Sequence, residues 1–295
     1  LKEVRVIGSG HKGNDSGEEY ESRQRQFAAD AASFLERRVF EKSYVMGVSW
    51  GTTLFFVADA LDARIRKKRG SAEFIKFVPV VGNPVMVEAN PRHSASQICA
   101  MLNHTFNLGD GETLSLSGQP AWLAPHAEAV RRWVESTKGY RDVFGEPTGG
   151  SSLRSGGAIE EIDTLITSIG VLGDKKLGKN DPWLKEAGIV SGAPSSSPLK
   201  ALEKESIGNI GGLYLPRDES QTEYVDMIRE SWMGVQVNHL GKCARQADSK
   251  RPGVVVLAMD GRKADVLARC LEMGLVNRLV IDRDLKERLD VLIAE

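Results

Sequence analysis

The clearest candidate for chemistry is the segment 47–53, which reads GVSWGTT and lies between an apolar run and an amphipathic one. Gly51 lets the chain turn tightly, and the first turn of a following helix exposes N–H groups carrying about half a positive charge. The hydroxyls of Ser49, Thr52 and Thr53 add donors. We expect an anion site here, suited to phosphate, although Ser49 or Thr52 could equally be a helix cap and nothing more.

The same residues match Gly-x-Ser-x-Gly, the nucleophile elbow of α/β hydrolases, with Ser49 as the nucleophile. Only two expected strands precede Ser49, whereas an elbow normally follows several. No His-Gly-Gly segment is available for an oxyanion hole. The last histidine of the chain, His239, is followed by two expected strand–helix pairs, whereas a triad histidine usually lies near the end of the domain. A serine hydrolase is therefore the least favoured alternative.

A second strand-to-helix turn carries Asp260, Gly261, Arg262 and Lys263. In a parallel sheet such turns lie at the carboxyl ends of the strands, where ligands bind. Cations in the first turn of a helix oppose its dipole, and a bound phosphate or carboxylate would relieve that conflict. The alternative is an Asp cap followed by two solvent-exposed cations. Asp260 is also the best-placed carboxylate for a general base.

Further glycines follow other expected strands. Gly82 and Asn83 end the apolar run 74–81, and Gly170 and Gly173 follow the run 162–169. Each is weak evidence alone, because glycine often simply ends a strand. Together with the two turns above, they are expected to converge on one crevice at the carboxyl edge of a sheet.

The elements that must position these turns follow from periodicity. Strands are expected at 4–7, 44–48, 74–81, 113–116, 142–144, 162–169, 254–259 and 278–281, and helices at 18–38, after Gly51, and at 94–106, 125–136, 262–273 and 283–293. Their alternation predicts an α/β fold with a parallel sheet flanked by helices. We expect one domain over 1–295 with irregular loops around 147–198, and Asp282 as the cap of the last helix.

Composition narrows the function classes. The chain has 295 residues, a net charge of −1 and three scattered cysteines. We therefore expect no disulfide framework, zinc site or cofactor, no membrane span, and a reducing cytoplasm. The basic run 64–69 is expected to be a solvated helix end. No helix-turn-helix is evident. If the protein regulates DNA, its DNA-binding part is therefore expected to lie outside this chain, whose start at Leu1 rather than at a methionine suggests truncation.

The chain resembles the sugar-binding domains of SorC/DeoR-family transcription regulators. The resemblance is most specific at 254–267, reading VVVLAMDGRKADVL, and at 274–282, reading GLVNRLVID. The segments 47–53, 78–82 and 207–212 resemble other parts of the family pattern, in order. Departures are Asn83, where many members have a second glycine, and Asn209, where aspartate is more usual.

The resemblance implies a Rossmann-like fold similar to sugar-phosphate isomerases and CoA transferases. It implies a phosphorylated sugar effector, a dimer or tetramer, and contact with DNA only through an N-terminal helix-turn-helix that this chain lacks. By motif match, Ser49, Gly51, Thr52 and Thr53 hold the phosphate, and Lys263 is its cation. We expect Lys263 to be exposed and of little importance to stability.

Three hypotheses follow. The leading one is an effector-binding domain, not an enzyme, that couples a phosphorylated sugar to oligomer arrangement and DNA binding. The alternatives are a sugar-phosphate isomerase of related fold that uses Asp260 as its base, and the Ser49 hydrolase.

Overall fold

A central parallel sheet organises the chain in this computed structural model, which describes residues 1–8, 17–65, 75–83, 91–107, 113–118, 121, 127–147, 154–172, 197–220 and 222–294. The strand order is β1-β10-β9-β6-β2-β3, and all five pairings along this path are parallel. The strands are β1 (Glu3–Ile7), β2 (Val45–Val48), β3 (Lys76–Pro79), β6 (Thr164–Gly170), β9 (Gly253–Ala258) and β10 (Arg278–Asp282).

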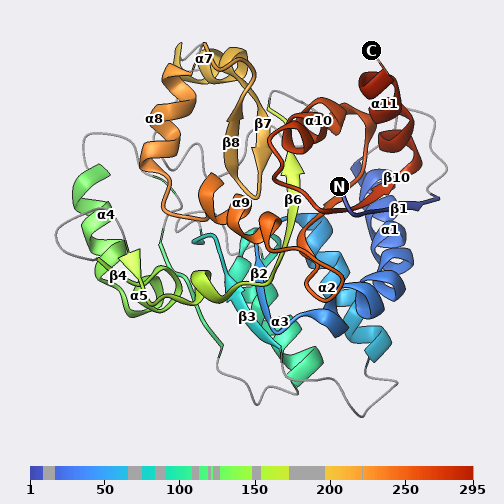
Figure 1. Ribbon diagram of the computed structural model, residues 1–295, viewed down its shortest axis with the longest axis horizontal. Coiled ribbons are helices and arrows are strands. Elements are labelled where there is room, and N and C mark those ends of the chain that lie inside the picture. Colours follow the sequence, from blue (N-terminus) through green and yellow to red (C-terminus); the bar gives the residue numbers. More distant parts are fainter. Residues whose placement is uncertain are drawn as a thin grey trace.

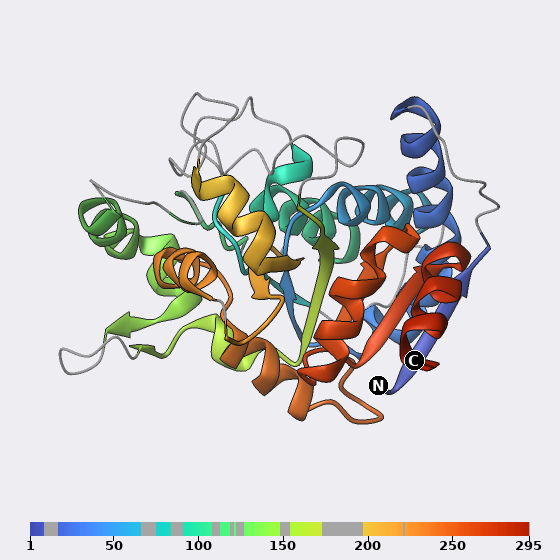
Figure 2. The same cartoon turned by 90° about the horizontal axis from the view of Figure 1, so that it is seen from above.

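Helices cover both faces of the sheet, so its central strands β2, β6 and β9 are mostly buried (Figures 1 and 2). In β9 every residue is buried: Val255 and Leu257 pack on one face, and Val254 and Val256 on the other. A buried parallel strand has this composition. The first face is covered by α1 (Gly17–Arg38), α2 (Thr52–Ile65) and α3 (Ala95–Asn107).

Residues from α4, α5 and α7–α11 pack in the core on the other face. These helices are α4 (Ala127–Ser136), α5 (Lys138–Phe144), α7 (Ser197–Glu205), α8 (Glu223–Ser231), α9 (Val237–Arg245), α10 (Ala264–Glu272) and α11 (Arg283–Ala294). Short 3-10 helices are η1 (Phe40–Lys42), η3 (Pro91–His93), η4 (Ala158–Glu161) and η5 (Gly261–Lys263), and β4 (Glu146–Pro147) pairs with β5 (Arg154–Ser155).

An antiparallel hairpin extends the sheet beyond the parallel strands. Strand β7 (Ser206–Ile210) pairs with the end of β6 and with β8 (Leu213–Pro216) (Figure 1). The two residues that join them, Gly211 and Gly212, both have positive φ, at 60° and 92°. Two-residue hairpin loops require this conformation, which glycine adopts without steric cost. Sequence analysis predicted no strand in this part of the chain.

Most of the predicted elements are confirmed, with small shifts of their ends. The strands expected at 4–7, 44–48, 74–81, 162–169, 254–259 and 278–281 are β1, β2, β3, β6, β9 and β10, and each expected helix is also present. The helix expected at 262–273 begins with the 3-10 turn η5 before α10. The predicted parallel sheet flanked by helices is therefore confirmed.

Two predicted strands are wrong. The segment 142–144 is the end of α5, where the buried residues Tyr140, Val143 and Phe144 have helical spacing. Thr137 caps that helix through its side chain, and Gly145 ends it with φ at 84°. The described residues 113–116 form no strand, and only the neighbouring Ser117 makes an isolated parallel bridge, to Asn83.

The basic run 64–69 and the loops expected around 147–198 are only partly within the described residues. Arg64 of the basic run lies in the last turn of α2, as expected, and forms an ion pair with Glu36 of α1. Residues 66–69, and most of the loops expected around 147–198, lie outside the described residues. Within the described part of the chain, none of the helices is both long and apolar enough to cross a membrane.

One prediction concerns stability against pH. The backbone N–H of Gln236 donates to Nδ1 of His239 at 3.1 Å to close the first turn of α9, which requires an unprotonated nitrogen. Burial, with the nearby Lys242 charge, lowers the pKa of His239 below its usual 6.5, although Glu160 opposes the shift. The unfolded chain therefore binds this proton more readily, and stability falls as pH drops below about 6.5. Denaturant unfolding at pH 8 and pH 5.5 should show this, and His239→Gln should flatten the dependence. An equally steep dependence in the variant would contradict it.

Candidate ligand-binding site

The sheet brings most of the predicted site residues to one edge. Gly51 and its neighbours follow β2, Asn83 follows β3, and Asp260–Lys263 follow β9. Strand β6 lies between β2 and β9 and places Ser168 between the two turns. Two strand spacings amount to roughly 10 Å, so a ligand that contacts both turns must lie across Ser168.

Gly51 fixes the turn into α2. Its φ is 135°, and a Cβ atom there would lie 2.7 Å from Oγ of Ser168. Its N–H donates to the carbonyl of Arg92 at 3.0 Å, so this group is already used and is not an open donor for an anion. Its carbonyl accepts from Phe55 N, which makes Gly51 the cap of α2. The N–H groups of Thr52, Thr53 and Leu54 have no acceptor within the helix.

Ser49 supports this turn from below. It has no exposed surface, and its hydroxyl donates to Oγ1 of Thr167 at 2.9 Å. The hairpin residue Gly211 lies against both, because a Cβ there would be 2.8 Å from Thr167 Oγ1 and 3.4 Å from Ser49 Cβ. A hydrolase nucleophile must be exposed and hydrogen bonded to a base. The burial of Ser49 and its hydrogen bond to Thr167 are those of a structural support instead.

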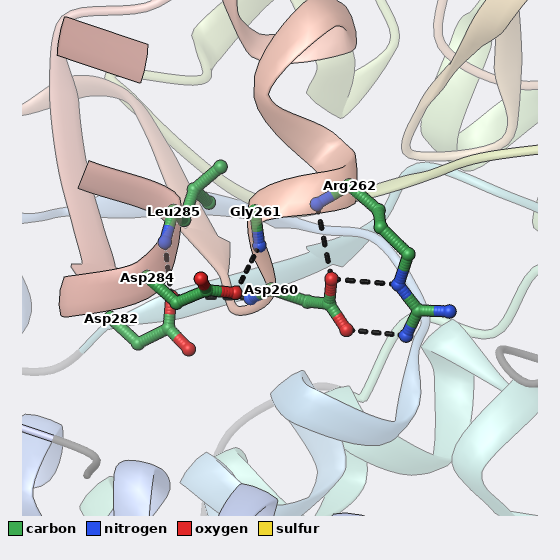
Figure 3. Close-up of polar contacts among 6 residues, drawn as sticks. All are labelled: Asp260, Gly261, Arg262, Asp282, Asp284 and Leu285. Atoms are coloured by element: carbon green, nitrogen blue, oxygen red, sulfur yellow. Dashed lines mark hydrogen bonds and ion pairs between the residues drawn. The ribbon is translucent and has the colours of Figure 1, made fainter. Parts of the chain in front are cut away.

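The turn after β9 is held by two carboxylates (Figure 3). Asp282, at the end of β10, accepts from Asp260 N at 3.1 Å and from Leu285 N at 3.0 Å. The second bond confirms that Asp282 caps α11. Asp284 accepts from Gly261 N at 2.7 Å. Asp260 has a φ of 87°, and it is the only non-glycine residue with positive φ among the described residues. Such strained positions often occur at functional sites.

Arg262 turns back onto Asp260. Its backbone N–H and its Nε donate to Oδ1 at 3.0 and 2.8 Å, and Nη2 reaches Oδ2 (Figure 3). Burial acts to raise the pKa of Asp260, but these hydrogen bonds and the charges of Arg262 and Lys263 outweigh it and lower that pKa. A carboxylate held in this way is a weak proton acceptor. The contacts therefore disfavour Asp260 as the base of an isomerase.

The expectation that Lys263 is exposed is wrong. It lies in η5, directly before α10, and only 7% of its surface is accessible. Among the described residues, no hydrogen bond or ion pair engages its ammonium group. Burial lowers its pKa, while the charges of Asp260 and Asp282 partly offset the shift. The sequence pattern could not reveal this burial, because it depends on how the turn packs against α11.

The remaining predicted residues differ in their environments. Asn83 has a buried Oδ1 with no hydrogen bond partner among the described residues. Gly82 is buried beside it. Gly170 lies inside β6, paired with Asn209, rather than in a turn, and the Asn209 side chain occupies the space beside it. Gly173 lies outside the described residues.

Sequence analysis missed the contribution of α1. Glu21 accepts from both terminal nitrogens of Arg92, at 2.9 and 3.0 Å, and Arg92 in turn receives the Gly51 N–H at its carbonyl. Gln24 reaches Oγ1 of Thr53 at 3.4 Å. Tyr20 is close enough to Asp260, Asp282 and Arg262 to feel their charges. The apolar periodicity of α1 marked it as a covering helix and gave no signal of this role.

Comparison with known proteins supports the architecture. No family profile matches the chain, and no curated protein matches it. Among solved structures, a DeoR-family transcriptional regulator from Listeria monocytogenes has a TM-score of 0.63 at 18% identity, covering 97% of this chain and 92% of its own. The full-length sorbitol operon regulator SorC from Klebsiella pneumoniae has a TM-score of 0.67 at 16% identity, covering 99% and 77% respectively.

A third structure, named as a sugar-binding domain of a transcriptional repressor from Vibrio fischeri, has a TM-score of 0.62 at 18% identity, covering 100% of this chain and 95% of its own. This is the fold of the DeoR/SorC sugar-binding domain. The fold expected from the resemblance is thereby confirmed over nearly the whole length. The likeness to these structures is a likeness of fold.

We predict that Gly51→Ala destabilises the protein. The alanine would have to hold φ at 135° with its Cβ against Ser168 Oγ. Backbone strain of this kind costs about 1–3 kcal/mol, and chemical denaturation should show a loss of that size. Gly8→Ala is the matched control, because no described residue lies within 4 Å of a Cβ at Gly8. Equal stability of the two variants would contradict the role given to Gly51.

We predict that Asp282→Ala lowers the free energy of unfolding by about 1–3 kcal/mol, because it leaves the buried N–H groups of Asp260 and Leu285 without an acceptor. Asp282→Asn keeps an acceptor at Oδ1. It also removes a buried negative charge, since burial disfavours the charged carboxylate and raises the pKa of Asp282. The loss of unfolding free energy in Asp282→Asn should therefore be much smaller. Denaturant unfolding of both variants provides the test. Equal losses would mean that the charge of Asp282, rather than its two hydrogen bonds, stabilises the turn.

Proposed function

We propose that this chain is the effector-binding domain of a sugar-responsive transcription regulator of the SorC/DeoR family, with a phosphorylated sugar as its effector. The observation that carries the proposal is Lys263, whose side chain lies largely buried at the carboxyl edge of the sheet and whose ammonium group has no hydrogen bond or ion pair partner among the described residues. Burying a cation without a direct partner is costly, and a bound anion would lower that cost.

A second group of donors faces the same ligand in this proposal. The N–H groups of Thr52, Thr53 and Leu54 open α2, which has no acidic residue in its first turn. A helix N-terminus attracts phosphate through these groups and through its dipole. A phosphate beside Ser168 would lie between this terminus and Lys263. Gly82, Asn83, Gly170 and Gly261 are proposed to shape the remainder of the site.

Regulation would require partners. The similar proteins named above are transcriptional regulators, a sugar-binding domain among them. We propose that this chain forms a homo-oligomer in the cytoplasm, that effector binding changes the arrangement of its subunits, and that DNA is bound by a separate domain. No cofactor is needed for such a role.

Calorimetric titration with sugar phosphates tests the proposal. Fructose 6-phosphate, glucose 6-phosphate and ribose 5-phosphate should be compared with fructose, glucose and ribose. At least one phosphate should bind, and its unphosphorylated sugar should bind far more weakly. Enzymatic conversion of a bound sugar phosphate into its isomer would support the isomerase alternative instead. Labelling by a serine-reactive fluorophosphonate, lost in Ser49→Ala, would support the hydrolase.

Lys263→Ala should weaken binding of that sugar phosphate by about ten- to a hundredfold, since a charge-assisted hydrogen bond is worth about 1.5–3 kcal/mol. Because Lys263 is buried, the apo stability of the variant must be measured alongside by denaturation. Lys138→Ala is the matched control, as Lys138 is exposed and pairs with Asp142 on α5. Unchanged affinity in a folded Lys263→Ala variant would reject the assignment.

A further inference from the structure

The hydroxyl of Tyr20 is a buried polar group that the fold leaves unused. Its Oη has no hydrogen bond partner among the described residues, although the side chain lies on the first turn of α1, close enough to Asp260, Arg262 and Asp282 to be affected by their charges. The ring itself is occupied, because the Arg23 guanidinium lies 5.4 Å from its centre. Buried hydroxyls in native proteins nearly always have a partner. An exception beside a candidate site calls for one that binds from outside.

The first turns of α1 are held firmly against the turn after β2 and the start of α2. Glu21 accepts two hydrogen bonds from Arg92, whose carbonyl receives the Gly51 N–H, and Arg92 also lies 4.9 Å above the ring of Phe56 in α2. Gln24 donates to Thr53 in the first turn of α2. Tyr20 thus sits on a braced element, as a residue that positions a ligand should.

The charges around Tyr20 define what it can bind. Burial, followed by the negative charge of Asp260, raises the pKa of Tyr20, so its hydroxyl stays protonated and can donate. Asp282 adds a second negative charge, while Arg262 and Arg23 act in the opposite direction. The two carboxylates accept hydrogen bonds from hydroxyl groups, and the neutral Tyr20 hydroxyl, unlike the Lys263 ammonium group, brings no positive charge that would offset their repulsion of a phosphate dianion. The surroundings of Tyr20 therefore suit the neutral, hydroxyl-rich part of a sugar.

We propose that Tyr20 contacts a hydroxyl or carbonyl oxygen of the sugar moiety, on the side of the site formed by α1, β9 and β10, while the phosphate lies nearer to the first turn of α2. This assignment rests on the proposed function, and it makes Tyr20 a residue that selects among sugars rather than one that binds the phosphate. A sugar phosphate bound in this way would join α1 to the turn after β9.

Tyr20→Phe tests the proposal because it removes only the hydroxyl. In the apo protein the melting temperature should stay unchanged or rise, since a buried polar group without a partner is removed. Binding of whichever of fructose 6-phosphate, glucose 6-phosphate and ribose 5-phosphate the wild type prefers should weaken roughly tenfold, the effect of losing one hydrogen bond. Tyr44→Phe is the control, because Tyr44 is 61% exposed and lies before the amino end of β2.

The outcomes separate this inference from the proposed function. If the wild type binds one of the three sugar phosphates and Tyr20→Phe binds it equally well, the Tyr20 assignment is wrong and the proposed function stands. A clear fall in the apo melting temperature of Tyr20→Phe would show that the hydroxyl is structural and would also overturn the assignment. If the wild type binds none of the three, both the proposed function and the Tyr20 assignment are overturned.

Discussion

The buried carboxylate of Asp282 is the interaction on which the candidate site depends. Its Oδ1 accepts from Asp260 N and from Leu285 N, so one group holds the turn after β9 and begins α11. It thereby stabilises the positive φ of Asp260, whose side chain in turn receives the fork of Arg262. The turn then directs Lys263 into the protein rather than toward solvent.

Two turns at the carboxyl edge of the sheet, each fixed by hydrogen bonds, form the candidate site. The turn after β2 is fixed by Gly51 and by the contact of its N–H with Arg92, and the turn after β9 is fixed by Asp282. Helix α1 is bonded to the first turn of α2 through Gln24, and its Tyr20 lies close enough to Asp260 and Asp282 to be affected by their charges. The donors and charges that a ligand would meet are therefore organised before it binds, which reduces the cost of ordering them.

Sequence analysis predicted the parallel sheet because its central strands are apolar runs that alternate with amphipathic helices. It also placed Gly51 and Asp260–Lys263 correctly at strand-to-helix turns, and Asp282 as a cap. The predictions from sequence were wrong, or missing, where tertiary contacts rather than the local residue pattern determine the structure. The β7–β8 hairpin is a short antiparallel addition to the parallel sheet. The segment 142–144 is too short for its pattern to distinguish a strand from a helix. The burial of Lys263 and the position of Tyr20 arise from contacts between segments far apart in the sequence.

The most direct test of the account is the position of a bound sugar phosphate in a crystal structure of this chain. The account predicts phosphate density beside Ser168, within hydrogen-bonding distance of the Lys263 ammonium and of the first-turn N–H groups of α2, with the sugar extending toward Tyr20. A sugar phosphate bound away from this edge of the sheet, or with its phosphate out of reach of Lys263, would contradict it.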